Sequence, residues 1–205
     1  MAQITTGIRS IFSNPTVYSL FQNLMGARKF RVGFIDEFVR PFPGSALLDI
    51  GCGPADILEF LPKVDYWGFD ISESYINQAT IRFGAKGHFQ CKLLQEADLA
   101  QMPAFDIVLL MGVLHHLDDQ TATDVLNLAN KALKPGGRLL TFDPCFEPGQ
   151  SPIARFLINH DRGQNVRSQQ GYTKLAEQVF KSPKVIVRHQ SWVPYTHCFM
   201  ECTRT

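Results

Sequence analysis

The chain has 205 residues, of which 45% are hydrophobic and 19% charged, and its net charge is +1. This length and composition fit one globular domain with a substantial core, which excludes a disordered protein. No apolar run approaches the roughly 18 residues that span a bilayer, the first residues lack a secretion signal, and the charge balance does not indicate nucleic-acid binding. We therefore expect a cytoplasmic protein without a membrane or nucleic-acid partner.

The first 45 residues are predicted to form a helical cover. Pro15 follows an asparagine at a typical helix start, and apolar residues recur at helical spacing after it. Phe30, Phe34 and Phe38 recur every four residues, which predicts a second helix.

Residues 46–56 combine a strand, a tight turn and a helix start. The strand is apolar except for Asp49, and Gly51, Cys52 and Gly53 follow it directly. Glycine adopts positive φ without a steric penalty and lets a ligand approach the backbone closely. We therefore expect this turn to bind a ligand.

The acids around the turn indicate which ligand it does not bind. A dinucleotide fingerprint has a third glycine three residues after the second, where this chain has Asp56. Asp49 and Asp56 would repel a pyrophosphate but attract a ligand that carries ammonium and sulfonium groups. An NAD-dependent oxidoreductase remains an alternative only.

Strands and helices alternate through the rest of the chain, which predicts a doubly wound, mostly parallel α/β sheet of seven strands with an antiparallel last strand. Further strands are expected at 65–70, 87–93, 105–111, 137–143, 184–190 and 197–203, and helices at 55–61, 73–83, 119–133 and 171–180, with a polar insertion at 147–170.

Four segments in order resemble motifs of the class I S-adenosylmethionine (SAM) methyltransferases. Residues 47–55 resemble the first motif, acid-x-Gly-x-Gly-x-Gly, with Ala55 in place of the last glycine. Residues 66–72, 105–117 and 133–140 resemble the second strand, the fourth strand with its following loop, and the turn that leads into the fifth strand. The resemblance implies one methyltransferase domain, divided into a helical cover at 1–45, a SAM-binding core at 46–146, and a substrate wall with the closing strand pair at 147–205.

The resemblance also implies a set of SAM-binding residues: Asp49, Gly51, Cys52, Gly53, Asp70, Ile71, Asp98, Met111 and Gly112. Asp70 ends the second strand, where the family's acid accepts hydrogen bonds from the ribose hydroxyls, and Ile71 would lie against the adenine. The chain departs from the family after the third strand, where the acid that contacts the adenine amine is expected. Asp98 is the nearest candidate.

His115 is the candidate catalytic residue. It follows the fourth strand, where amino-methylating members of the family carry an Asn/Asp-Pro-Pro-Tyr motif that this chain lacks. A histidine can deprotonate a hydroxyl acceptor near neutral pH. The sequence predicts no metal ligands.

The substrate is expected to lie between the N-terminal cover and the insertion. Candidate contacts are Tyr18, Asp161, Arg162 and Arg167. Both flanking segments have a basic excess while the core is acidic, which favours a small anionic or polar metabolite methylated on oxygen. An RNA or protein methyltransferase, and a SAM-binding module without activity, remain alternatives.

Overall fold

The computed structural model describes residues 27–161, 163–190 and 195–205. The predicted helix after Pro15 lies outside these residues. The strands are β1 (Ala46–Ile50), β2 (Asp65–Asp70), β3 (Gly87–Cys91), β4 (Phe105–Met111), β5 (Leu133–Phe146), β6 (Arg167–Ser168), β7 (Lys184–Gln190) and β8 (Tyr195–Thr203). The α-helices are α3 (Ala27–Phe34), α4 (Glu73–Phe83), α5 (Glu96–Leu99), α6 (Asp119–Ala132), α7 (Pro152–Asn159) and α8 (Gln169–Glu177).

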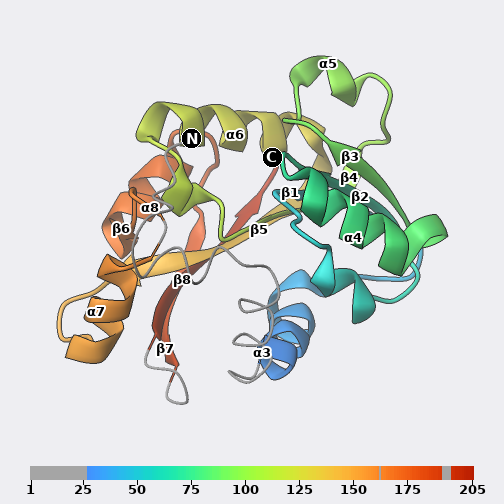
Figure 1. Cartoon of the computed structure of the whole chain (residues 1–205). Helices are drawn as coiled ribbons and strands as arrows, with labels where there is room; N and C mark the ends of the chain where they lie inside the picture. The colour runs from blue at the N-terminus through green and yellow to red at the C-terminus, as the bar shows by residue number, and fades with distance from the viewer. Residues whose placement is uncertain (1–26, 162, 191–194) are drawn as a thin grey trace.

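The strands form one sheet with the order β3-β2-β1-β4-β5-β8-β7 (Figure 1). Strands β1 to β5 are parallel, whereas β8 runs antiparallel to both β5 and β7. This confirms the doubly wound sheet with an antiparallel last strand. The two-residue strand β6, which pairs with β5, is an addition that the sequence pattern did not predict.

Both faces of the sheet are covered, which explains why its central strands are apolar on both sides. On β4, Val108 and Leu110 pack toward α6 and α8, while Ile107 and Leu109 pack toward α3 and α4. The alternation fixes the register, because a shift by one residue would exchange the two faces.

The N-terminal cover is attached to the sheet by aromatic and polar contacts. Phe34 and Phe38 lie within 6.0 Å of Phe199 on β8, measured between ring centroids, which confirms that their spacing marks a buried helical face. The helix ends in a π-turn, η1 (Ile35–Val39), whose carbonyl groups at Phe38 and Val39 accept hydrogen bonds from Arg138 at 2.8 and 2.6 Å.

Two expectations were wrong. The helix predicted at 55–61 is a single 3₁₀ turn, η2 (Asp56–Glu59), because Ala55 takes a left-handed conformation with φ of 55° and Pro62 disfavours helical geometry just before it. The insertion at 147–170 contains helix α7, which starts at Pro152 and buries Ala154 and Ile158, one helical turn apart.

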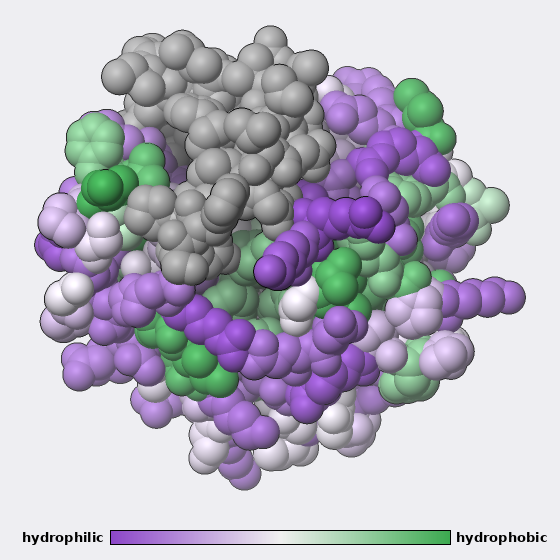
Figure 2. Space-filling view, turned by 90° about the horizontal axis from the view of Figure 1, so that it is seen from below, coloured by the Kyte–Doolittle hydropathy of each residue, from purple (hydrophilic) through white to green (hydrophobic). Residues whose placement is uncertain are grey.

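Seen from below the view of Figure 1, the surface is mostly hydrophilic with scattered apolar areas (Figure 2). Among the described helices, none has the length and apolarity needed to cross a membrane.

Candidate active site

The turn after β1 has the geometry that its glycines predict. Gly51 and Gly53 have φ values of 77° and 54°, and the N–H groups of Gly51 and Cys52 both donate to the carbonyl of Phe69 on β2. A Cβ atom on Gly51 would lie 2.6 Å from a methyl carbon of Val113, in the loop after β4. The turn thus brings the ends of β1, β2 and β4 together.

Asp70 lies beside this turn at the end of β2. Its carboxylate accepts hydrogen bonds from the N–H groups of Gly53 at 2.9 Å and Ser72 at 2.8 Å. The next residue, Ile71, is 54% exposed, and Leu93, two residues beyond the end of the neighbouring strand β3, is 59% exposed. An acid that is fixed next to exposed apolar side chains suits a ligand with a polar and a flat apolar part.

Asp49 is fully buried beneath the turn. Its Oδ2 accepts a hydrogen bond from the Tyr66 hydroxyl at 2.7 Å, whereas no described residue donates to its buried Oδ1. Burial raises the pKa of Asp49 to about 7, the bond from Tyr66 opposes this, and the charge of Asp70 adds to it. Asp49 is therefore an acid with one unsatisfied oxygen, next to the glycine turn.

His115 lies in the short helix η4 (Leu114–His116) after β4 and is only 5% exposed. Its Nδ1 is 2.8 Å from Oδ1 of Asp143 on β5, and its Nε2 is 3.5 Å from Oδ1 of Asp161, the second residue after α7. Burial lowers the pKa of His115, but the hydrogen bonds and charges of the two carboxylates outweigh burial and raise it to about 9. In this arrangement His115 is an imidazolium at neutral pH.

The loop that carries Asp161 closes over His115. The Tyr195 hydroxyl and the N–H of Gly163 donate to Asp161, and a Cβ on Gly163 would lie 2.0 Å from the imidazole ring of His115. Burial works against ionisation of Asp161, yet its bonds to His115 and Tyr195 hold its pKa below the usual range.

The glycine turn and His115 belong to one site, since both contact the loop after β4. Val113 packs on Gly51, and a Cβ on Gly112 would be 3.7 Å from Cε1 of His115. All of these groups lie at the carboxyl edge of the sheet, where doubly wound folds bind ligands.

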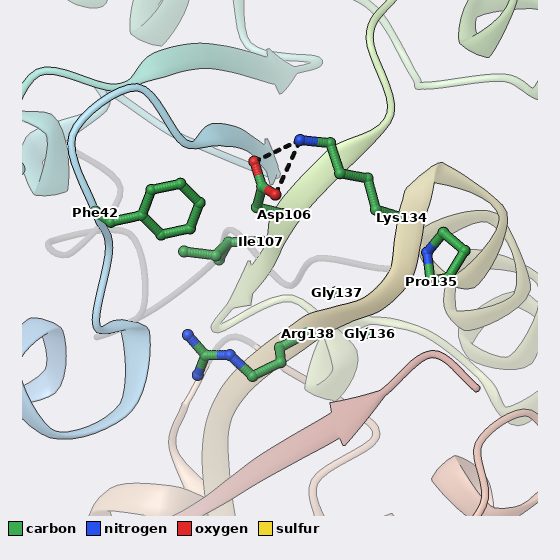
Figure 3. Close-up of a pocket in the computed structure, with 8 residues that line it drawn as sticks. All are labelled: Phe42, Asp106, Ile107, Lys134, Pro135, Gly136, Gly137 and Arg138. Carbon is green, nitrogen blue, oxygen red and sulfur yellow. Dashed lines mark hydrogen bonds and ion pairs between the residues drawn. The ribbon is translucent and has the colours of Figure 1, made fainter.

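A shallow pocket of about 220 Å³ lies at the opposite, amino edge of the sheet (Figure 3). Its charged groups already have protein partners: Lys134 pairs with both oxygens of Asp106, and Arg138 donates to the carbonyls of η1. We do not assign the pocket as the active site, because doubly wound sheets bind their ligands at the carboxyl edge and this pocket lies at the amino edge.

The sequence is similar to those of known methyltransferases. The sequence profile of the family described as "Methyltransferase domain" matches residues 48–139. The ubiquinone biosynthesis O-methyltransferase of Idiomarina loihiensis is 28% identical over 124 residues, which are 58% of this chain and 50% of that protein. The enzyme of the same name from Acinetobacter baylyi is 27% identical over 128 residues, 60% of this chain and 53% of that protein. The matched part of the chain, residues 48–139, is thus similar to a methyltransferase domain.

Solved structures show the same methyltransferase fold. The pyocyanin biosynthetic protein PhzM has a TM-score of 0.72 at 16% identity, over 98% of this chain and 63% of PhzM. The N-methyltransferase NodS of Bradyrhizobium japonicum, in complex with S-adenosylhomocysteine, has a TM-score of 0.61 at 16% identity, over 86% of each chain. The sequence matches cover about half the length of the two named curated methyltransferases.

Three predicted contacts have other partners or lie outside the described residues. Asp98 uses its carboxylate to cap α5 through the N–H of Gln95 and to pair with Lys92, so its contact with adenine stays a prediction. Tyr18 and Arg162 lie outside the described residues.

Arg167 binds other parts of the protein, and the structure does not support the substrate contact expected of it. All five of its N–H donors are engaged: they bind Asp119 and the carbonyl groups of Leu114, Leu117 and Asn165. The side chain therefore ties the loop over His115 to η4, and it has no free donor for a substrate.

Asp143, Tyr195 and Tyr66 are candidate site residues that the sequence did not reveal. Asp143 ends an apolar strand segment as Asp49 and Asp70 do, and this signal would have identified it. Tyr195 and Tyr66 gave no such signal, because each acts through a carboxylate that is distant in the sequence.

Proposed function

We propose that this methyltransferase transfers the methyl group of SAM to an oxygen atom of a small polar or anionic acceptor. The observation that carries the proposal is the pair of His115 and Asp143, in which Nδ1 is fixed at 2.8 Å and Nε2 faces the loop of Asp161. A sulfonium methyl is already activated, so the protein mainly aligns the reactants. Only an acceptor that must lose a proton, such as a hydroxyl, needs a base in this position.

The residues at the turn suit SAM. No heavy atom lies within 4 Å of a Cβ built on Gly53, so the space beside that glycine is open, and the unsatisfied Oδ1 of Asp49 can accept a hydrogen bond from an ammonium group. In this proposal Gly53 and Cys52 line the methionine part through their backbone, Asp70 binds the ribose, and Ile71 lies against the adenine. SAM supplies the reactive methyl group.

The acceptor is proposed from three features. The curated relatives are named as O-methyltransferases. The basic excess of residues 151–205, which include the loop over His115, favours an anionic molecule. The active-site loop buries His115 to 5% exposure, which suits a small acceptor better than a polymer.

The experiment that tests this function is a screen with SAM labelled in its methyl group. Phenols, catechols and hydroxy acids are compared with amines, peptides and RNA, and the labelled products are identified by mass spectrometry. We expect label only on oxygen atoms of small acceptors. Label on nitrogen, on a peptide or on RNA would overturn the proposed acceptor class, and turnover by none of them would favour a binding module.

The rate of methyl transfer is expected to rise with pH on the acidic limb of its pH profile. His115 must be neutral to accept a proton, and the carboxylates of Asp143 and Asp161 hold its pKa near 9. The variant Asp161→Asn removes one of these charges, so His115 should lose its proton at lower pH and the limb should shift to lower pH. The measurement is kcat against pH for both proteins. A limb that stays in place would show that His115 does not set it.

A further inference from the structure

Among the described residues, the acid beneath the glycine turn has no cationic partner. Asp56, five residues after the turn begins, pairs with both Arg31 and Arg82, whereas no described Lys, Arg or His side chain pairs with Asp49. The ionisable groups that face Asp49 are Tyr66 and Asp70 from β2 and Cys52 from the turn. The described ionisable groups around Asp49 thus carry no positive charge.

An isolated buried carboxyl group favours its neutral form, since a carboxylate without a counter-charge pays a large desolvation cost. Burial raises the pKa of Asp49 to about 7, so the neutral acid persists to a much higher pH than in an exposed aspartate. Tyr66 limits the effect, because its hydroxyl donates to Oδ2 at 2.7 Å and stabilises the carboxylate. The proton is therefore retained in the free protein but can be released.

We propose that Asp49 and Tyr66 make cofactor binding an exchange, in which the acid releases a proton to solvent as the ammonium group of the ligand arrives. The inference rests on the proposed binding of SAM at this turn. In the exchange, the O–H bond of the Asp49 carboxyl group breaks, its proton goes to buffer, and the ammonium donates a hydrogen bond to the carboxylate at Oδ1. No other bond forms or breaks, and charge is conserved.

Tyr66 is a positioning residue in this exchange. It donates to Oδ2, which leaves Oδ1 as the oxygen that can still accept a hydrogen bond, and it stabilises the ionised form of the carboxyl group. Without the hydroxyl, Asp49 would hold its proton more tightly, and the cofactor would have to displace it at a greater cost.

Calorimetric titration with SAM in two buffers of different ionisation enthalpy tests the exchange. At about pH 6 to 7, below the range in which the ligand's own amino group titrates, we expect the wild-type protein to release a fraction of a proton per SAM bound, and more at the lower pH. Asp49→Asn should abolish this release. Tyr66→Phe should retain it, extend it to higher pH, and weaken SAM binding several-fold at neutral pH.

Tyr172→Phe is the matched control, because Tyr172 is also fully buried but donates its hydroxyl to the carbonyl of Pro144. It should leave proton release unchanged. SAM binding by the wild-type protein with no buffer dependence, or equal release by Asp49→Asn, would overturn the exchange while leaving the proposed cofactor intact. No SAM binding at all would instead contradict the proposed function itself.

Discussion

Replacing His115 by glutamine is expected to lower kcat for methyl transfer by about 10²- to 10⁴-fold, the usual contribution of a positioned general base. Glutamine keeps a polar side chain of similar reach between Asp143 and Asp161 but cannot take up a proton. The Kd for SAM should change little, because His115 contacts the cofactor turn only through the loop after β4. The measurement is kcat together with SAM affinity.

His160→Gln provides the control for this variant. His160 is exposed, and its ring nitrogen lies 2.8 Å from the carbonyl of Phe156, away from the two carboxylates. It should retain wild-type kcat. A His115→Gln protein that binds SAM normally and keeps its full kcat would show that no base is needed at this position, and would favour an acceptor that reacts without losing a proton.

The variant Gly51→Val should bind SAM at least about a hundredfold more weakly than the wild-type protein. The backbone there has a φ of 77°, which costs a β-branched residue on the order of 1–3 kcal/mol. In addition, the new Cβ would lie 2.6 Å from a methyl carbon of Val113, so the loop that carries His115 must move. Binding is measured by calorimetry, and retention of the fold by circular dichroism.

Gly149→Val is the control that separates the strain of a positive φ from the steric contact with Val113. Gly149 has a nearly equal φ of 76°, but nothing lies within 4 Å of an added Cβ, and the residue is outside the turn. It should lose some stability and keep SAM affinity. If both variants bind SAM as tightly as the wild type, the turn at position 51 is not the cofactor cradle.

The sequence predicted most of the architecture because hydrophobic periodicity determines it. The bounds expected for β2, β4, β7 and α4 agree with the structure residue by residue. In each, apolar side chains recur at the strand or helix period, and turn residues mark both ends. Helix α7 was missed because it buries only Ala154 and Ile158, while its other apolar residues, such as Ile153 and Phe156, are exposed and obscure the helical pattern.

The candidate site was only partly predictable. Residues at strand ends, such as Asp70 and His115, could be placed because the topology brings all carboxyl ends to one edge. The contact of His115 with Asp161, and the bond of Tyr195 to that carboxylate, could not, since these residues are 46 and 80 positions further along the chain and meet only through loop closure. Arg167 shows the same limit: its charge favoured a substrate contact, but only the structure shows that four backbone and side-chain acceptors already share its donors.

The central claim, that SAM binds at the carboxyl edge beside the glycine turn, is tested most directly by calorimetric titration with SAM and S-adenosylhomocysteine. The wild-type protein should bind both with micromolar Kd, and Asp70→Ala should bind at least about tenfold more weakly, because the ribose loses a charged hydrogen-bond partner. Asp65→Ala, at the exposed start of the same strand, should bind like the wild type. Absence of binding by the wild-type protein, or equal affinity of the Asp70→Ala variant, would contradict the account.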